Sequence, residues 1–197
     1  MSEIPIFPLR TVLYPGGRLD LRIFEARYVD MTKACLRDQS PFGVCLIEGG
    51  FEVGQPAVPA ALGCSARIQE WEVPSPGLFT LHTRGETRFR LRRRRVQADG
   101  LILGEVDWLP PPDPLPLPDH ATALADLLRQ LIETLGADHF PQPPRFEDAA
   151  WVAYRLAEIL PVIPERKRDL LAVESPAELI EQVAGWIAEL QAARDPD

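Results

Sequence analysis

The densest group of chemically active side chains in the sequence is a run of arginines. Seven of them fall between residues 84 and 95, with Glu86 as the one opposing charge: Arg84, Arg88, Arg90, Arg92, Arg93, Arg94 and Arg95. Guanidinium groups bind phosphate and carboxylate oxygens, so the segment predicts a patch for an anion or a nucleic acid. Alternate side chains of a strand point to opposite faces, so about half of these arginines can share one stripe.

A structural role for the arginines is the competing interpretation. They could balance the acidic half of the chain and keep a strand edge from pairing with another chain. Binding of single-stranded nucleic acid also needs aromatic stacking partners, and Phe89 is the one aromatic residue in this segment. We favour the structural interpretation and keep nucleic acid as the alternative partner.

Other common reaction centres are not indicated. Phosphate-binding loops combine glycines with a lysine, but the sequence has no Gly-Lys dipeptide and only Lys33 and Lys167 as lysines. His82, His120 and His139 are too scattered to form a metal motif, and no serine lies in a G-x-S-x-G elbow. We predict no catalytic residue, no metal and no cofactor. A paired acid and base among the many carboxylates stays open as an alternative.

The cysteines and the start of the chain suggest a location. Cys35, Cys45 and Cys64 are odd in number and form no C-x-x-C pair, so we expect buried, reduced thiols. The first residues lack the charged and apolar regions of a signal peptide, and no run of about 18 apolar residues occurs. We therefore expect a soluble, cytoplasmic protein without a membrane partner.

A proline-rich segment divides the chain into two halves. Six of the ten residues in "PPPDPLPLPD" at 110–119 are prolines, which favours an extended polyproline conformation. Residues 1–109 carry a net charge of +1, whereas residues 110–197 carry −9. We predict a β domain at 1–109, a linker at 110–119 and a helical domain at 120–197.

The first half has the pattern of a small, curved sheet. Short alternating apolar runs predict strands at 19–23, 42–47, 64–73, 78–84, 87–96 and 101–109. A helix is predicted from Glu25 to Leu36, where apolar residues recur at helical spacing, and we expect it to cap an open barrel. Leu103 and Val106 fall on opposite faces of the last strand, and we expect Gly104 to form the bulge that resets this register.

The second half has helical periodicity. One helix is predicted from Asp119, as its N-cap, to Gly136, and others at 147–160 and about 164–173. The last helix has the clearest start, because Ser175, Pro176 and Glu178 form a capping box with proline at the first helical position. These helices predict a small bundle.

Turn and helix-end preferences predict structural roles for residues near the start of the chain. Pro15 and Gly16 predict a type II turn, because glycine accepts the positive φ that this turn requires. Glu25 suits the positive end of the following helix dipole, and Arg27 could bridge back to a carboxylate while Tyr28 packs. Each of these residues thus has a structural task.

Several motifs together resemble the amino-terminal domain of ATP-dependent Lon proteases and its stand-alone bacterial relatives. They are "PIFPLRTVLYPGGRLDLRIFEARYVDM", "FGVCLI", "GETRFRL" and the helical "AAWVAYRLAEILPVIPERKRDLLAVESPAELIEQVAGWI". The resemblance implies an α+β fold, with a small PUA-like β pseudo-barrel carrying one inserted helix, followed by a C-terminal helical bundle. The matching residues, all expected to be mainly structural, are Phe7, Pro8, Leu9, Pro15, Gly16, Phe24, Glu25, Arg27, Tyr28, Gly85, Arg88 and Phe89.

The same resemblance implies a function without catalysis. The sequence has neither the nucleotide-binding loop of the Lon ATPase nor its protease domain, so we predict a module that recognises polypeptides. Barrel edges, or a groove between barrel and helices, are expected to add a strand or take apolar side chains. The candidate partner-binding residues are Tyr14, Arg18, Arg92, Arg93, Arg94 and Arg95. The alternatives are a PUA-like barrel that binds nucleic acid or anions, and an unrecognised hydrolase.

Overall fold

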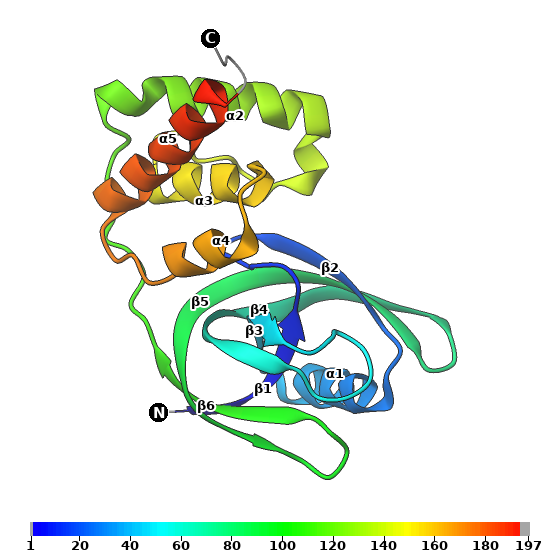
Figure 1. The fold of residues 1–197 in the computed structure, drawn as a ribbon. Helices are drawn as coiled ribbons and strands as arrows, with labels where there is room; N and C mark the ends of the chain where they lie inside the picture. The colour runs from blue at the N-terminus through cyan, green and yellow to red at the C-terminus, as the bar shows by residue number, and fades with distance from the viewer. Residues whose placement is uncertain (1, 194–197) are drawn as a thin grey trace. The chain divides into compact units, whose positions relative to one another are not determined.

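The alternating segments of the first half form strands, and the periodic segments of the second half form helices. The computed structural model describes residues 2–193. The chain divides into two compact units, Met1–Pro110 and Pro111–Asp197 (Figure 1). Among the described residues, the first unit contains β1 (Ser2–Leu9), β2 (Arg18–Ile23), α1 (Ala26–Asp38), β3 (Phe42–Gly49), β4 (Val58–Ser75), β5 (Leu78–Val96) and β6 (Ile102–Trp108). The fold class is therefore α+β, as predicted.

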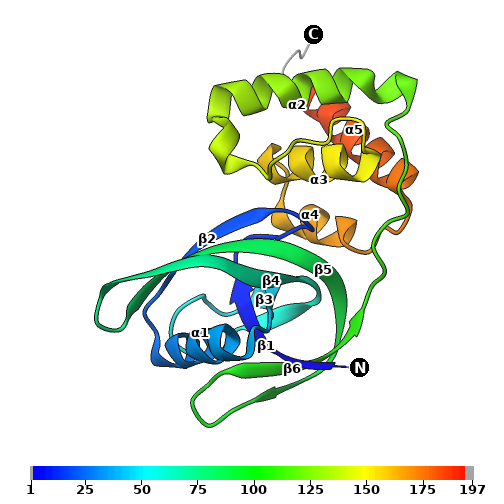
Figure 2. The same ribbon diagram turned by 180° about the vertical axis from the view of Figure 1, so that it is seen from behind.

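The strands pair in the order β2-β5-β4-β3-β1-β6, and β5 also pairs with β6. The pairings of β5, β4, β3, β1 and β6 thus close into a ring, and β2 lies outside it, antiparallel to β5. The β1 and β3 pair is parallel. The outer parts of β4 and β5 continue past the ring as a hairpin, with β2 alongside (Figure 2). Among the described strands, β2 therefore has a neighbour on one side only.

Two apolar clusters stabilise the first unit. The smaller cluster contains buried residues of β1, β3, β5 and β6: Ile4, Ile6, Cys45, Phe89, Ile102 and Val106. The larger one joins strands to α1, whose Tyr28, Met31 and Cys35 are buried in it. The predicted helix is thus confirmed, and it packs against the strands. Burial of this apolar area is the main favourable contribution to folding.

Two local predictions about β5 and β6 are wrong. The predicted strands at 78–84 and 87–96 form the single strand β5, because Gly85 continues the ladder opposite Ala66 of β4. The bulge predicted at Gly104 occurs instead on β5, between Leu91 and Arg93. Gly104 packs closely against its neighbours, since a Cβ there would lie 2.5 Å from the Leu91 side chain.

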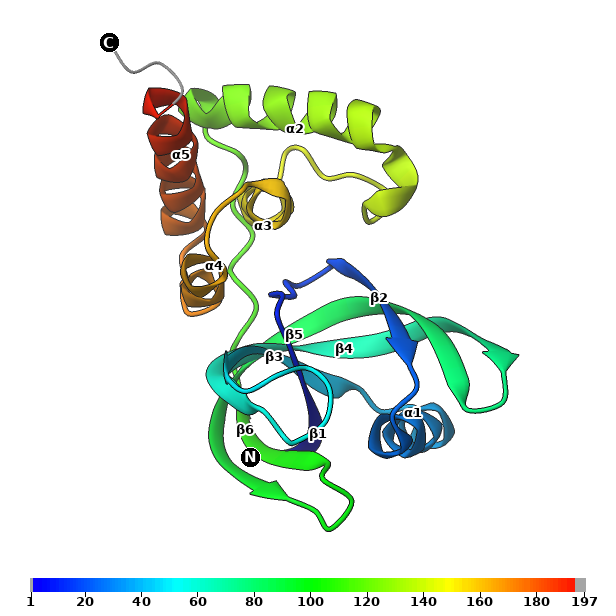
Figure 3. The same ribbon diagram turned by 45° about the vertical axis from the view of Figure 1, so that its right-hand side comes forward.

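The second unit is helical. Its described elements are α2 (Thr122–Leu135), α3 (Ala149–Ile159), α4 (Pro164–Leu170) and α5 (Pro176–Ala192), with short 3-10 turns at Asp119–Ala121 and Ala137–His139. These helices cross one another: in Figure 3, α3 is seen almost end-on while α2 lies across the view. Within residues 2–193, no helix combines the length and apolar character needed to cross a membrane.

The helix ends test the capping rules. The Ser175 side chain accepts a hydrogen bond from the Glu178 N–H at the start of α5, with Pro176 at the first position, as predicted. Gly136 ends α2, also as predicted. The prediction that Asp119 is the N-cap of this helix is wrong. Asp119 begins the 3-10 turn, and its carbonyl accepts from the Thr122 hydroxyl at 2.8 Å.

The proline-rich segment 110–119 has hydrogen-bonding partners in the second unit. The Leu117 N–H donates to the Glu147 carbonyl at 2.7 Å, and the Leu115 carbonyl accepts from the Ala149 N–H at 3.0 Å. Prolines have no backbone N–H, so a leucine between them supplies the donor. This part of the segment therefore runs beside the start of α3.

The three cysteines have the state predicted from the sequence. Cys35, Cys45 and Cys64 are all free and buried. Burial raises the pKa of the Cys35 and Cys45 thiols. These thiols therefore behave as small apolar core residues and are poor nucleophiles.

Candidate functional site

A tight turn holds β2 beside the rest of the first unit. The Gly17 N–H donates to the Tyr14 carbonyl at 2.9 Å, and Gly16 has a φ of 75°, as a type II turn requires. The turn is fixed to β5 by two bonds, from the Gly16 N–H to the Gly85 carbonyl and from the Gly85 N–H to the Gly17 carbonyl, each 2.8 Å. A Cβ at Gly85 would overlap the Tyr14 carbonyl oxygen. Only glycine at 85 therefore allows this turn to pack on β5.

The F-E-x-R-Y segment connects β2 to α1. The Arg27 guanidinium donates to the Glu25 carboxylate at 2.9 Å and to the Gly100 carbonyl at 3.3 Å. It also lies over the Tyr28 ring, 4.7 Å from the centroid, and Tyr28 in turn contacts Phe7 at 4.2 Å between centroids. The predicted bridge from Arg27 to a carboxylate is thus present. This network positions Phe24, the first residue of the motif, whose side chain is 59% exposed.

The β3–β4 loop, residues 50–57, is fixed in place at two points. The Glu52 carboxylate accepts from the Arg10 N–H at 2.6 Å. The Gly54 N–H donates to the Glu25 carboxylate at 3.4 Å, so Glu25 links this loop to the start of α1. Val53, between these two contacts, is therefore held at the surface.

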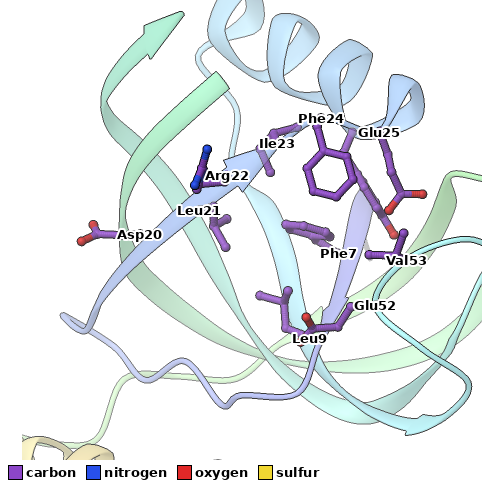
Figure 4. Close-up of a pocket in the computed structure, with 11 residues that line it drawn as sticks. Phe7, Leu9, Asp20, Leu21, Arg22, Ile23, Phe24, Glu25, Glu52 and Val53 are labelled. Carbon is purple, nitrogen blue, oxygen red and sulfur yellow. The ribbon is translucent and has the colours of Figure 1, made fainter. Parts of the chain in front are cut away.

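Strands β1 and β2, the segment at the start of α1 and the β3–β4 loop enclose a pocket of about 180 Å³, which we call the β1–β2 pocket. Its apolar lining includes Phe7 and Leu9 from β1, Leu21 and Ile23 from β2, and Tyr28 from α1. Its remaining lining residues are Asp20, Arg22, Phe24, Glu25, Glu52 and Val53. Figure 4 shows the Phe7, Leu21 and Ile23 side chains directed into the space between the two strands. The pocket thus has an apolar interior and a mixed, partly charged rim.

Exposed apolar side chains gather beside the β1–β2 pocket. Phe24 and Val53 line it and are 59% and 56% exposed, and Phe51, two residues before Val53, is 71% exposed. The Arg10 guanidinium lies 5.8 Å from the centre of the Phe51 ring. Large apolar groups that are neighbours on a surface commonly mark a binding site, whereas single ones need no explanation.

Charged groups at the rim are engaged with one another. Asp20 on β2 bonds to Arg18 at 3.0 Å and to His82 of β5 at 2.7 Å. Partial burial opposes ionisation of Asp20, but the hydrogen bonds from Arg18 and His82 outweigh it and lower the pKa of the carboxyl. Asp20 is therefore a carboxylate at neutral pH.

A second pocket is larger but has a different character. It measures about 310 Å³ and lies between the end of α1 and β4, where Leu36 and Arg67 are among its lining residues. The Arg67 guanidinium already donates to the Gln39 carbonyl and to Glu86, both at 2.5 Å. No large, exposed apolar side chain among residues 2–193 lines this pocket. We therefore take the β1–β2 pocket as the candidate site.

The structure distributes the candidate partner-binding residues over separate places. Tyr14 is fully buried, which corrects the prediction that its side chain contacts a partner. Arg18 is partly exposed and bonds to Asp20 at the pocket rim. The other candidates are on the far part of β5, away from the pocket lining: Arg92, Arg93, Arg94 and Arg95.

The arginine segment is less available for a partner than its composition indicates. Arg92 donates to Asp107 of β6 at 2.5 Å, and Arg95 pairs with Glu3 of β1 at 2.8 Å. Arg88 is buried and donates to the Pro110 carbonyl at 2.7 Å. Several positive charges thus have partners within the first unit.

Sequence reasoning missed the residues that shape the site. Leu21, Glu52 and Val53 were not predicted to bind a partner, and Phe24 was expected to be structural although its ring is mostly exposed. The segment "GGFEVGQP" at 49–56 could have indicated the site. Its two apolar residues lie in a glycine-rich turn and do not follow the spacing of a buried strand or helix. No group of three or more side chains that could hold a metal ion occurs within residues 2–193.

Comparisons with known proteins agree with the fold. Residues 3–189 match the family model described as the ATP-dependent protease La (LON) substrate-binding domain. The crystal structure of a Lon N-terminal domain protein from Xanthomonas campestris is 38% identical, with a TM-score of 0.79, over 94% of this chain and 99% of that one. The N-terminal domain of Mycobacterium avium complex Lon protease is 17% identical, with a TM-score of 0.65, over 95% and 98%. No curated protein sequence matches.

Proposed function

The chain belongs to the family of the Lon substrate-binding domain, and from this premise we propose that it recognises polypeptides without catalysing a reaction itself. The β1–β2 pocket is the proposed contact surface. The domain organisation proposed with it is a β domain at 1–109, a linker at 110–119 and a helical domain at 120–197. The closed ring of pairings supports a pseudo-barrel of the PUA-like kind in the β domain.

One observation carries the proposal: exposed aromatic and aliphatic side chains surround a pocket that has an apolar interior. Phe24 and Val53 line the pocket while remaining more than half exposed. Burying such groups against a partner is favourable by about 25 cal/mol per Å² of apolar area. Unfolded polypeptides present apolar side chains that folded proteins hide, so they suit this surface.

The arginine segment does not support a second function. Arg92 and Arg95 are already paired with carboxylates of neighbouring strands. Nucleic-acid binding would have to break these pairs or rely on the remaining arginines. We therefore put forward only the polypeptide function.

The test is an anisotropy titration of the whole chain against a fluorescein-labelled, unfolded casein at two salt concentrations, with RNA as competitor. We expect binding that persists at high salt and that RNA does not displace, because apolar contacts are screened little by salt. The variant Phe24→Ser should weaken binding about tenfold, through loss of buried aromatic area. Val96→Ser is the matched control, since Val96 is 53% exposed but does not line the pocket.

Two results would contradict the proposal. Equal weakening by Phe24→Ser and Val96→Ser would show that apolar surface in general binds the casein. Binding that appears only at low salt and is displaced by RNA would assign the function to the arginine segment.

A further inference from the structure

The free edge of β2 shows how a polypeptide could bind. Within residues 2–193, β2 pairs only with β5, and it does so from Arg18 opposite Arg84 to Ile23 opposite Phe79. In this part of the chain, the other edge of β2 has no strand beside it. Such an edge is a template for another extended chain.

Two hydrogen bonds show which backbone groups point to this edge. The Gly17 carbonyl accepts from the Gly85 N–H at 2.8 Å, and the Leu19 carbonyl accepts from the Thr83 hydroxyl at 2.7 Å. Both carbonyls therefore face β5. The direction alternates along an antiparallel strand, so the N–H and C=O groups of Asp20 and Arg22 face away from β5.

The β1–β2 pocket lies where such an added strand would run. Strand β1 pairs with β6 only through Ser2–Ile6, so Phe7 to Leu9 have no strand on that side within the described residues. Phe7 and Leu9 line the pocket across from β2 (Figure 4). Pro8, between these two residues in β1, has no N–H, so β2 is the better partner for a backbone ladder.

The composition of the pocket fits an extended segment with alternating side chains. Successive side chains of a strand point to opposite faces. A segment beside β2 would therefore direct every second side chain toward the apolar lining around Phe7 and Leu21, and the others toward solvent. Arg22 and Glu52 add charged groups to the lining of the same pocket.

We propose that the chain binds an extended polypeptide segment as an added strand on the free edge of β2, with an apolar side chain of that segment in the β1–β2 pocket. This rests on the proposed function, which it deepens by naming the conformation that is recognised. Backbone hydrogen bonds then supply affinity for many sequences, and the pocket selects an apolar residue.

The test uses nine-residue peptides with a central leucine between alternating serine and threonine residues, measured by anisotropy against the whole chain. Each backbone N–H in turn is replaced by N-methyl. We expect affinity to fall about tenfold or more at every second position and to change little at the positions between, because only alternate N–H groups face β2. A peptide with serine in place of the central leucine is the control for the pocket.

A second readout leaves both molecules unmodified. The backbone amide of Arg22 should exchange with solvent at least tenfold more slowly when the peptide is bound, because it then donates to the added strand. The amide of Val73, on the β4–β5 hairpin, should exchange at the same rate with and without peptide.

The outcomes separate the two proposals. Peptide binding with no two-residue periodicity and no protection at Arg22 would overturn strand addition while leaving the proposed function intact. No peptide or casein binding at all would overturn both. Dimers of this chain that protect Arg22 in the absence of peptide would show that a second copy occupies the edge, which also overturns the proposal.

Discussion

The arginine-rich part of β5 and the β1–β2 pocket differ in how visible they are in the sequence. The first shows seven like charges in twelve residues, yet Arg88 is buried and Arg92 and Arg95 are paired with neighbouring carboxylates. The second is assembled from ordinary apolar residues of three segments, among them Phe24 and Val53, which remain exposed. A conspicuous composition thus belongs to a strand in which several charges already have partners, while an inconspicuous one forms the surface that we propose for a partner.

The two regions differ because exposure to water is favourable for arginine side chains but costs free energy for apolar side chains. An exposed arginine is well solvated and needs no partner, so its presence on a surface carries little information. An exposed phenylalanine next to an apolar pocket leaves apolar area in water, which a partner can cover. The comparison predicts that changes at the pocket alter binding and that changes at the arginines do not.

The largest loss of stability is expected at Gly85, where the turn that leads into β2 packs against β5. In Gly85→Ala, the new Cβ would overlap the Tyr14 carbonyl oxygen, so the turn that leads into β2 must move. We expect a loss of about 3 kcal/mol in the free energy of unfolding, as for an overpacked core site, measured by urea denaturation. Peptide affinity should fall with it, because β2 forms one wall of the pocket.

The control for this variant is Gly49→Ala. A Cβ at Gly49 would meet Val58 at 3.6 Å, an ordinary contact, so we expect a change of less than about 1 kcal/mol. Equal stability of Gly85→Ala and the wild type would show that the turn is not held against β5 in solution.

The next effect concerns pH and the second unit. Burial raises the pKa of Glu158 to about 7, against the opposing charges of Arg155 and Lys167. The folded-state pKa lies above the unfolded one, so the stabilisation is complete below about pH 4.5 and is lost as the pH rises toward 7. A quarter of the Glu158 side chain is exposed, which moderates the effect, so we expect a loss of about 2 kcal/mol.

Thermal melts between pH 4.5 and 8 measure this loss, and Glu158→Gln should flatten the pH dependence. Peptide affinity should stay constant through the same range, because Glu158 does not line the pocket. An affinity that follows the titration of Glu158 would show that binding is not confined to the first unit.

Local patterns in the sequence predicted most of the fold, because the relevant forces act over a few residues. The Pro15-Gly16 turn, the cap at Ser175 and the helix at 26–38 all follow from neighbouring residues. The errors at Gly85 and Gly104 involve pairing between distant segments, whereas the error at Asp119 is local. The bulge predicted at Gly104 is wrong because the extra residue lies on the paired strand β5, between Leu91 and Arg93.

The site was harder to predict than the fold for the same reason. Phe7, Leu21 and Val53 meet only through strand register and through the hydrogen bonds that hold the β3–β4 loop. No spacing in the sequence relates them. Phe24 was matched to a family motif, but the motif does not show that its ring is mostly exposed to solvent.

A more moderate effect should follow from placing a charge in the rim of the pocket. In Val53→Asp, a carboxylate would replace an apolar group beside Phe24 and near Glu25, which disfavours an apolar side chain of the partner. We expect casein affinity to fall about twentyfold in anisotropy titrations, equivalent to roughly 1.8 kcal/mol. Val73→Asp is the control, since Val73 is 46% exposed on the β4–β5 hairpin and outside the pocket. Comparable losses for both variants would mean that general acidity, and not the pocket, determines affinity.

The smallest effect is expected at the arginines, and it tests the comparison most directly. Arg93 and Arg94 are exposed on β5, where successive side chains point to opposite faces. The double variant Arg93→Ala and Arg94→Ala leaves the pairs of Arg92 with Asp107 and of Arg95 with Glu3 in place. Casein affinity should therefore change less than about twofold at either salt concentration, because a distant charge is screened within about 10 Å at 0.1 M salt. A large loss that grows as salt is lowered would reverse the comparison, since the arginine segment would then be the surface that meets the partner.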